Sequence, residues 1–124
     1  MAGYVTKLEK KALANKYFRE VLFTGPHSQL VVMSIAPGDD IGMETHSDVD
    51  QFIRIEAGTG KAILDGKTHA LEDGSAVMIP AGVQHNIVNT AKTVPLQLYT
   101  VYTPPEHKDG TVHKTKADAL AAHH

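Results

Sequence analysis

The sequence of 124 residues has no cysteine, no long apolar run and no excess of charge of one sign. Without cysteine, disulfides, thiolate zinc sites and cysteine nucleophiles are excluded. The net charge of −2, with both signs mixed along the chain, gives no electrostatic reason to expect binding to nucleic acid or to a membrane surface. No apolar segment approaches the ~20 residues that span a bilayer, and residues 1–16 lack the apolar stretch of a secretory signal. We therefore expect a cytoplasmic protein that binds neither nucleic acid nor membrane.

Three parts of the chain differ in character, and their total length fits one domain. Residues 1–16 predict an N-terminal arm or a short helix, because residues that favour helix fill Thr6–Lys16. Residues 17–104 alternate short apolar runs with turns rich in glycine and proline. Residues 105–124 form a polar C-terminal tail in this prediction, with a last helix over Thr115–Ala122.

The central part has the rhythm of an all-β protein. Glycines recur every eight residues, at Gly58, Gly66, Gly74 and Gly82. This spacing leaves room for short strands joined by tight turns, which predicts a sandwich or a barrel. The predicted strands are Tyr17–Phe23, Gln29–Ala36, Gln51–Glu56, Lys61–Leu64, His69–Leu71, Ala76–Ile79, His85–Asn89 and Leu96–Tyr102.

The predicted strand Gln51–Glu56 alternates with a period of two. One face carries Gln51 and two isoleucines, so we expect this face to point inward. Arg54 and Glu56 then fall on the outer face, as a pair exposed to solvent or to another subunit. A buried amide on Gln51 needs polar partners, and a metal ion would be one.

Two segments of the central part carry glycines and polar residues at regular spacing. The first contains Gly38, Glu44, His46, Gln51 and Gly58, and the second contains Gly74, Pro80, Gly82, His85 and Asn89. In these spacings the sequence resembles the cupin family, whose first motif has His-x-His and a later Glu, and whose second has Pro-x-Gly, His and Asn. The second segment agrees at every position. The first agrees in spacing, but has Glu44 and Gln51 where the family has His and Glu.

The resemblance implies an all-β, cupin-type jelly-roll barrel, a double-stranded β-helix, with short helical segments at both ends. It also implies a divalent metal ion inside the barrel, held by Glu44, His46, Gln51 and His85. Position 44 gains the carboxylate that position 51 loses, so the formal charge of the ligand set is unchanged. This set suits Zn, Mn, Fe, Ni or Co. A structural role is implied for Asn89, which we expect to tie down the turn after Ala81-Gly82.

Alternatives to a site with four ligands remain open at this point. Two changes in the ligand set also fit a cupin that has lost its metal, although random loss would more often leave apolar or small residues. Gln51 is a weak neutral ligand, and it could instead hydrogen-bond to a metal-bound water. Copper(I) is disfavoured unless a sulfur ligand points inward from Met33, Met43 or Met78.

Candidate catalytic residues are few. Glu44 could act as a general base if it does not bind the metal. Tyr102 or Tyr99, on the last strand, could line the cavity as a hydrogen-bond donor or general acid, and periodicity does not decide which of them faces inward. Asp48 and Asp50 could form an acid–base pair, but roles in a turn are favoured.

The resemblance favours a metal-dependent enzyme that acts on a small polar or carbohydrate-like substrate. A Lewis-acid metal would then serve an isomerase or lyase reaction, as in a mannose-6-phosphate isomerase-like cupin. A metal-dependent dioxygenase is the rival enzyme, since two histidines and one carboxylate leave coordination sites open. A non-enzymatic module that binds or senses a small ligand is the alternative from another class. Cupins of this size commonly pair, so we expect a homodimer that shares an edge at Tyr17–Phe23 or the N-terminal arm.

Overall fold

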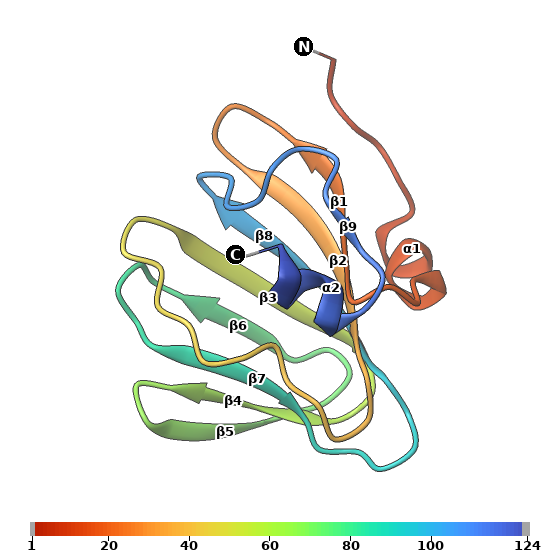
Figure 1. Ribbon diagram of the computed structural model, residues 1–124, viewed down its shortest axis with the longest axis vertical. Helices are drawn as coiled ribbons and strands as arrows, with labels where there is room; N and C mark the ends of the chain where they lie inside the picture. The colour runs from red at the N-terminus through yellow and green to blue at the C-terminus, as the bar shows by residue number, and fades with distance from the viewer. Residues whose placement is uncertain (1, 123–124) are drawn as a thin grey trace.

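The computed structural model describes residues 2–122, which form nine strands and two short helices (Figure 1). The strands are β1 (Arg19–Thr24), β2 (Gln29–Ile35), β3 (Asp50–Ala57), β4 (Gly60–Leu64), β5 (Lys67–Leu71), β6 (Ala76–Ile79), β7 (His85–Asn89), β8 (Leu96–Thr103) and β9 (Val112–His113). The helices are α1 (Leu8–Ala14) and α2 (Lys116–Ala121). Strands β6 and β7 have the predicted bounds, and the other predicted strands differ at their ends by a residue or two.

The strands form two antiparallel sheets that together make a barrel. One sheet has six strands in the order β6-β3-β8-β2-β1-β9, and the other has three in the order β5-β4-β7. Both sheets contribute to one apolar core, with Met33 and Leu98 fully buried from the first and Ala62 and Ile87 buried from the second. Burying one large apolar side chain stabilises the fold by about 1.5–3 kcal/mol. The predicted all-β jelly-roll barrel with short helices at both ends is confirmed.

Strand β8 lies inside the six-stranded sheet and shows which face of the last predicted strand points inward. Every second residue from Leu96 to Tyr102 is buried, and the residues between them are partly exposed. Tyr102 therefore faces the interior and Tyr99 does not. On this inner face, Tyr102 lies opposite Gln29 of β2 and Gln51 of β3.

The prediction that Glu56 lies on an exposed outer face is wrong. The pairing of β3 with β8 shifts register between Ile55 and Ala57, and two successive residues, Ile55 and Glu56, are both buried. An extra residue in a bulge breaks the strict alternation of a strand, which is why a period of two misplaces Glu56. Arg54 is half-exposed, and its Nε lies 2.9 Å from Glu56 Oε1.

The segment predicted to be a polar tail folds back onto the barrel. Strand β9 pairs with β1, and α2 begins with a capping box in which the Thr115 hydroxyl accepts from the Asp118 N–H. Because β9 pairs with Arg19 and Glu20 of β1, this part of the strand predicted at Tyr17–Phe23 is not a free edge for a second subunit. Residues 123 and 124 of the predicted tail lie outside the described residues. The homodimer and the cytoplasmic location stay predictions.

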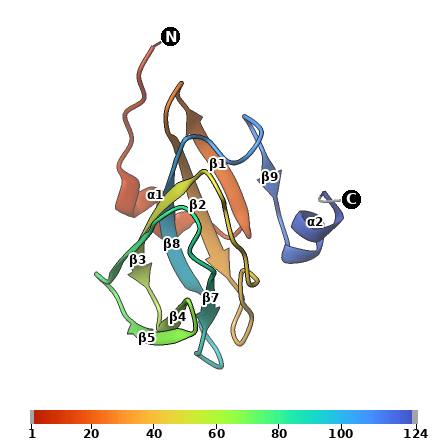
Figure 2. The ribbon, with the colours of Figure 1, turned by 90° about the vertical axis from the view of Figure 1, so that its left-hand side faces the viewer.

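The two helices lie at different sides of the six-stranded sheet. Figure 2 shows α1 beside β2 and β8, and β9 with α2 on the opposite side of the view. Ala12 is the buried residue of α1, and Ala119 is that of α2. No helix within residues 2–122 combines the length and the apolar character needed to cross a membrane.

Candidate metal centre

Three of the predicted metal ligands meet where the loop after β2 lies against the start of β7. Glu44 and His46 belong to the loop, and His85 is the first residue of β7. Two backbone hydrogen bonds of 2.8 Å join Glu44 and His85, since each N–H donates to the other carbonyl. One donor atom from each of the three side chains can be chosen so that all three lie within 4.8 Å of one another. Donors this close can share one ion at about 2.0–2.2 Å from each.

The turn of the second motif fixes the loop that carries His46. Gly82 has a φ of +89°, a conformation that favours glycine, and its N–H donates to the His46 carbonyl at 2.7 Å. The neighbouring N–H of Ala81 donates to Asp50 Oδ1 at 2.8 Å. Asp50 therefore supports the backbone between the two motifs, whereas Asp48 is exposed at the surface.

Both imidazoles are oriented by hydrogen-bonding neighbours. His85 is buried, and its Nδ1 lies 3.0 Å from the Val83 carbonyl, so a proton on Nδ1 leaves Nε2 as a metal donor. His46 lies between two carboxylates, with Nε2 at 3.0 Å from Glu44 Oε2 and Nδ1 at 3.4 Å from Glu106 Oε1. The Val83 carbonyl thus selects the tautomer of His85, and the two carboxylates fix the ring plane of His46.

Glu106 was not found by sequence reasoning, because it lies in the segment predicted to be a tail. The buried side chain of Gln29 holds this segment in place. Its Nε2 donates to the His107 carbonyl at 2.7 Å, and its Oε1 accepts from the N–H groups of Glu106 at 3.3 Å and His107 at 2.9 Å. In the sequence, an amide side chain on a predicted strand, Gln29, was the one sign of a polar contact here. It does not reveal that the contact is with the segment that carries Glu106.

Gln51, the fourth predicted ligand, lies on β3 and faces the same interior. It is only 4% exposed, and its Nε2 donates to Thr100 Oγ1 at 3.0 Å. Its Oε1 is buried without a hydrogen-bond partner. A buried acceptor that lacks a partner costs about 1–3 kcal/mol, so the fold stands to gain from a metal ion or a water at this oxygen. The donor set thus fits a divalent ion chemically.

Tyr102 lies beside the imidazoles of His46 and His107. Its ring makes edge contacts with His46, at 6.4 Å between centroids, and with His107, at 5.0 Å. Burial raises the pKa of Tyr102 above its usual value; Arg19 opposes this rise, and the charges of Glu44 and Glu106 add to it. The phenol therefore stays protonated at neutral pH, so its O–H can donate a hydrogen bond while its oxygen accepts one from Arg19.

A second polar network anchors the start of the loop that carries the ligands. Asn86, next to His85, donates to Asp40 Oδ2 at 2.9 Å and accepts from the Gly42 N–H at 2.9 Å. The Lys116 ammonium of α2 also binds Asp40. The hydrogen bond from Lys116 has the largest effect on the pKa of Asp40, and the hydrogen bond from Asn86 has the second largest. Both lower this pKa below its usual value.

Asn89 holds a different turn from the predicted one. Its Nδ2 donates to the carbonyls of Ile35 and Val94, each at 2.9 Å, and its Oδ1 accepts from the Ala91 N–H at 2.8 Å. It therefore fixes the loop between β7 and β8 against the end of β2. The prediction that it ties down the turn after Ala81-Gly82 is wrong, because that turn lies at the other end of β7.

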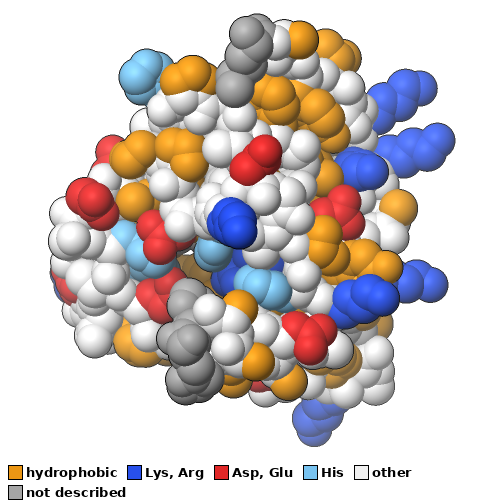
Figure 3. Space-filling model, turned by 45° about the horizontal axis from the view of Figure 1, so that its top comes forward, with side chains coloured by type: hydrophobic (Ala, Val, Ile, Leu, Met, Phe, Trp, Pro, Cys, Tyr) orange, Lys and Arg blue, Asp and Glu red, His pale blue; other side chains and the backbone are white. Residues whose placement is uncertain are grey.

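The surface is hollowed where acidic and histidine side chains gather, and Lys or Arg atoms are visible inside the hollow (Figure 3). Met43 and Met78 have exposed side chains, and Met33 is part of the apolar core. The sulfur ligand that copper(I) would require is therefore not supplied by Met43 or Met78.

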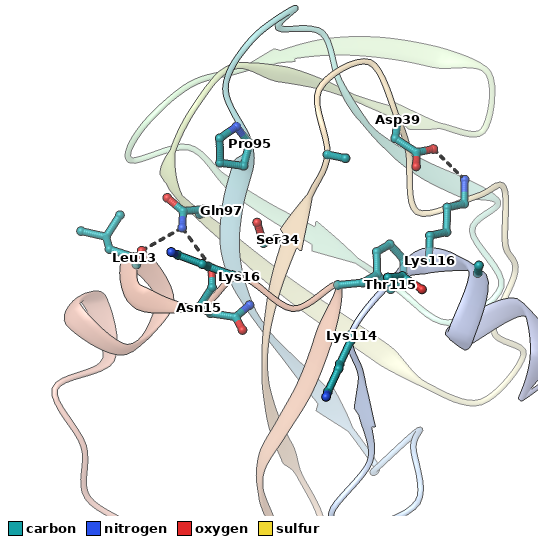
Figure 4. Close-up of a pocket in the computed structure, with 13 residues that line it drawn as sticks. Leu13, Asn15, Lys16, Ser34, Asp39, Pro95, Gln97, Lys114, Thr115 and Lys116 are labelled. Atoms are coloured by element: carbon teal, nitrogen blue, oxygen red, sulfur yellow. Dashed lines mark hydrogen bonds and ion pairs between the residues drawn. The ribbon is translucent and has the colours of Figure 1, made fainter.

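A separate cleft of about 650 Å³ lies outside the barrel (Figure 4). It is lined by the end of α1, the start of α2 and outer residues of β2 and β8, and it contains none of the predicted ligands.

Fold and site define a cupin: the profile of the cupin domain family matches residues 31–102, and the chain belongs to this family. The chain is 46% identical over 125 residues to the protein YrkC of Bacillus subtilis. This match covers 96% of this chain and 67% of that protein. Its fold matches the crystal structure of BH2720 from Bacillus halodurans with a TM-score of 0.94 and 42% identity, over 97% of this chain and 95% of that one.

A more distant match concerns only part of a larger protein. The chain is 29% identical over 77 residues to mannose-1-phosphate guanylyltransferase of Escherichia coli. The match covers 62% of this chain and 16% of that protein.

Proposed function

We propose that this cupin binds one divalent metal ion through Glu44, His46 and His85, with the Gln51 amide oxygen as a further donor. We propose further that it is an isomerase or lyase acting on a small polar or carbohydrate-like substrate. The observation that carries the proposal is the meeting of one carboxylate and two imidazoles within 4.8 Å. Bound there, a divalent ion would act as a Lewis acid on a substrate carbonyl.

The chain's own residues orient the proposed ligands. The Val83 carbonyl accepts from His85 Nδ1, which directs the other ring nitrogen toward the site. Glu106 holds His46 in a similar way, with its Oε1 at 3.4 Å from Nδ1. Glu44 is thereby left as the carboxylate ligand.

Tyr102 is the proposed hydrogen-bond donor to the substrate. It is 3% exposed and lies against His46, so a substrate oxygen near the ligands comes within reach of this part of the barrel. Because its pKa is raised, Tyr102 can stabilise negative charge on such an oxygen but cannot act as a base at neutral pH. Glu44 serves as a general base only in a state in which it is not a metal ligand.

One consideration supports this reading, and another supports its rival. The partial match to an enzyme named for mannose 1-phosphate favours a carbohydrate-like substrate. The set of two histidines and one carboxylate also suits iron-dependent dioxygenation, which makes a dioxygenase the second candidate. A module that only binds its ligand remains the alternative outside enzymology.

The proposal is tested by measuring metal content, and then reaction, on the full chain. We expect about one divalent ion per chain after purification or after reconstitution with Zn, Mn, Fe, Ni or Co. With the retained ion, sugars and sugar phosphates in heavy water should exchange the hydrogen next to their carbonyl group, as followed by NMR.

Three other outcomes would contradict parts of this proposal. Oxygen uptake without hydrogen exchange would identify the dioxygenase. Ligand binding without turnover would identify the binding module. A chain that retains none of the five ions would remove the proposed metal centre.

A further inference from the structure

Arg19 is a basic side chain inside the barrel. It is 4% exposed, and among residues 2–122 no lysine and no other arginine is buried. On β1 it lies opposite Met33 of β2, which in turn lies opposite Leu98 of β8. Met33 and Leu98 are fully buried in the core, so the three side chains share the inner face of the six-stranded sheet.

The guanidinium of Arg19 has no acidic partner among the described residues. Its Nη1 lies 3.3 Å from His113 Nδ1, and the group lies over the Phe18 ring at 5.2 Å from the centroid. Its Nε is buried without a hydrogen-bond partner. Arg54, the other arginine of the chain, is half-exposed and forms an ion pair with Glu56. A buried charge without a counter-charge opposes folding, so the position of Arg19 calls for a ligand that supplies one.

Arg19 faces the proposed metal centre through Tyr102. The charges of Arg19, Glu44 and Glu106 all act on the Tyr102 hydroxyl. The Tyr102 ring in turn contacts His46. The guanidinium is therefore a neighbour of the same interior space into which the ligands point.

The structure assigns to Arg19 the binding of an oxyanion, a carboxylate or phosphate group, on the substrate of this site. This inference rests on the proposed function and deepens it, because it names an anionic substrate class. The planar guanidinium suits such groups, since its N–H donors match two oxygens at once. The orphaned Nε of Arg19 would donate to one oxygen, and the far end of the substrate would reach the ligands.

The charge balance of the site favours an anion more strongly when the metal is present. Glu44 and Glu106 bring two negative charges and Arg19 one positive charge, which leaves one negative charge. A divalent ion reverses the sign to one positive charge. An anionic group would thus be attracted to the loaded site and held there by Arg19.

The test is calorimetric titration of the full chain with malonate and with inorganic phosphate, each with and without the retained divalent ion. Arg19→Met removes the charge at nearly constant size, Arg19→Lys keeps the charge without the planar fork, and Arg54→Lys is the matched control. We expect Arg19→Met to weaken the better anion by ~10-fold or more, Arg19→Lys to weaken it less, and Arg54→Lys to leave it unchanged. Preference for malonate or for phosphate identifies the substrate group.

The inference is overturned if the wild-type chain binds neither anion, or if Arg19→Met and Arg19→Lys bind both as tightly as the wild type. Thermal unfolding separates it from a structural role, because removal of an unpaired buried charge should not lower the Tm. A lower Tm with unchanged anion affinity would assign Arg19 to packing. Metal content, measured on the same samples, tests the proposed function independently. If the wild type retains no metal but its anion binding still depends on Arg19, the proposed metal centre is refuted and the role of Arg19 is not.

Discussion

The hollow of the barrel and the cleft between α1 and α2 use polar side chains in opposite ways. In the cleft, Gln97 Nε2 donates to the carbonyls of Leu13 at 2.8 Å and Asn15 at 3.1 Å, which fixes the end of α1 (Figure 4). Lys116 forms an ion pair with Asp39 at 3.0 Å, which fixes α2. These polar groups have partners within the protein, so the side chains of the cleft attach the two helices to the rest of the fold.

In the hollow, buried polar atoms lack partners. Gln51 Oε1 and Arg19 Nε have none, and the His46 ring lies between the carboxylates of Glu44 and Glu106. The cleft has a volume of about 650 Å³, yet the proposed metal centre lies in the hollow. Unsatisfied buried polar groups, rather than cavity volume, mark the candidate site in this protein.

Substitution of a direct metal ligand should produce the largest difference in metal affinity between variants of the hollow and variants of the cleft. His85→Ala and Glu44→Ala should each reduce metal affinity by more than the ~10–100-fold that loss of an outer partner costs. Lys114→Ala in the cleft and Asp48→Ala in the exposed loop should leave metal content unchanged. Metal analysis after dialysis makes the comparison, and equal content in all four variants would refute the ligand assignment.

Removal of the carboxylate behind His46 should have an intermediate effect. Glu106→Gln keeps the shape but removes the charge next to Nδ1, so metal affinity should fall by up to ~10-fold. Competition with a chelating dye measures the affinity, and Asp48→Asn is the matched control. An unchanged affinity in Glu106→Gln would show that Glu106 does not orient His46 in solution.

The two amides should respond to the same substitution with opposite sign. Gln51→Met removes a buried oxygen without a partner, which costs about 1–3 kcal/mol, and also the hydrogen bond to Thr100, which contributes about 1 kcal/mol. The free energy of unfolding of the metal-free protein should therefore rise, by up to about 1 kcal/mol. Gln97→Met removes the donor to two carbonyls at the end of α1, so the free energy of unfolding should fall by about 1 kcal/mol. Urea unfolding tests both, and a loss of stability in both variants would place Gln51 among the structural amides.

Acid should weaken the ion pairs of the cleft by a small amount. Because the pKa of Asp40 is lowered in the folded state, its stabilising contribution is complete above about pH 4 and is lost as the pH falls through the lowered value. Both groups are partly exposed, so the contribution should stay below ~1 kcal/mol. Between pH 6 and pH 3 the Tm of Asp40→Asn should fall less than that of the wild type. Parallel curves would contradict this assignment.

The strands of the barrel could be predicted because local signals specify them. Ala76–Ile79 and His85–Asn89 are short apolar runs between glycine- or proline-containing turns, and their bounds are those of β6 and β7. The resemblance to cupins implied four metal ligands, and three of them, Glu44, His46 and His85, lie together. Glu56 was misplaced because a bulge depends on the partner strand, which the alternation of one strand does not reveal.

The rest of the site depends on contacts between distant segments. Strand β9 has two residues, too few for any period, and Glu106 is positioned by hydrogen bonds from Gln29, more than 70 residues earlier. Arg19 lies in a strand whose inward face could be assigned only from its pairing with β2. Such placements follow from tertiary structure and have no local signature.

Anomalous diffraction from crystals loaded with manganese or zinc tests the metal centre most directly. We predict one anomalous peak per chain, bound by Glu44, His46 and His85 and within reach of Gln51 Oε1. A peak at the acidic pair Asp39 and Asp40 of the cleft, with none in the hollow, would contradict the account.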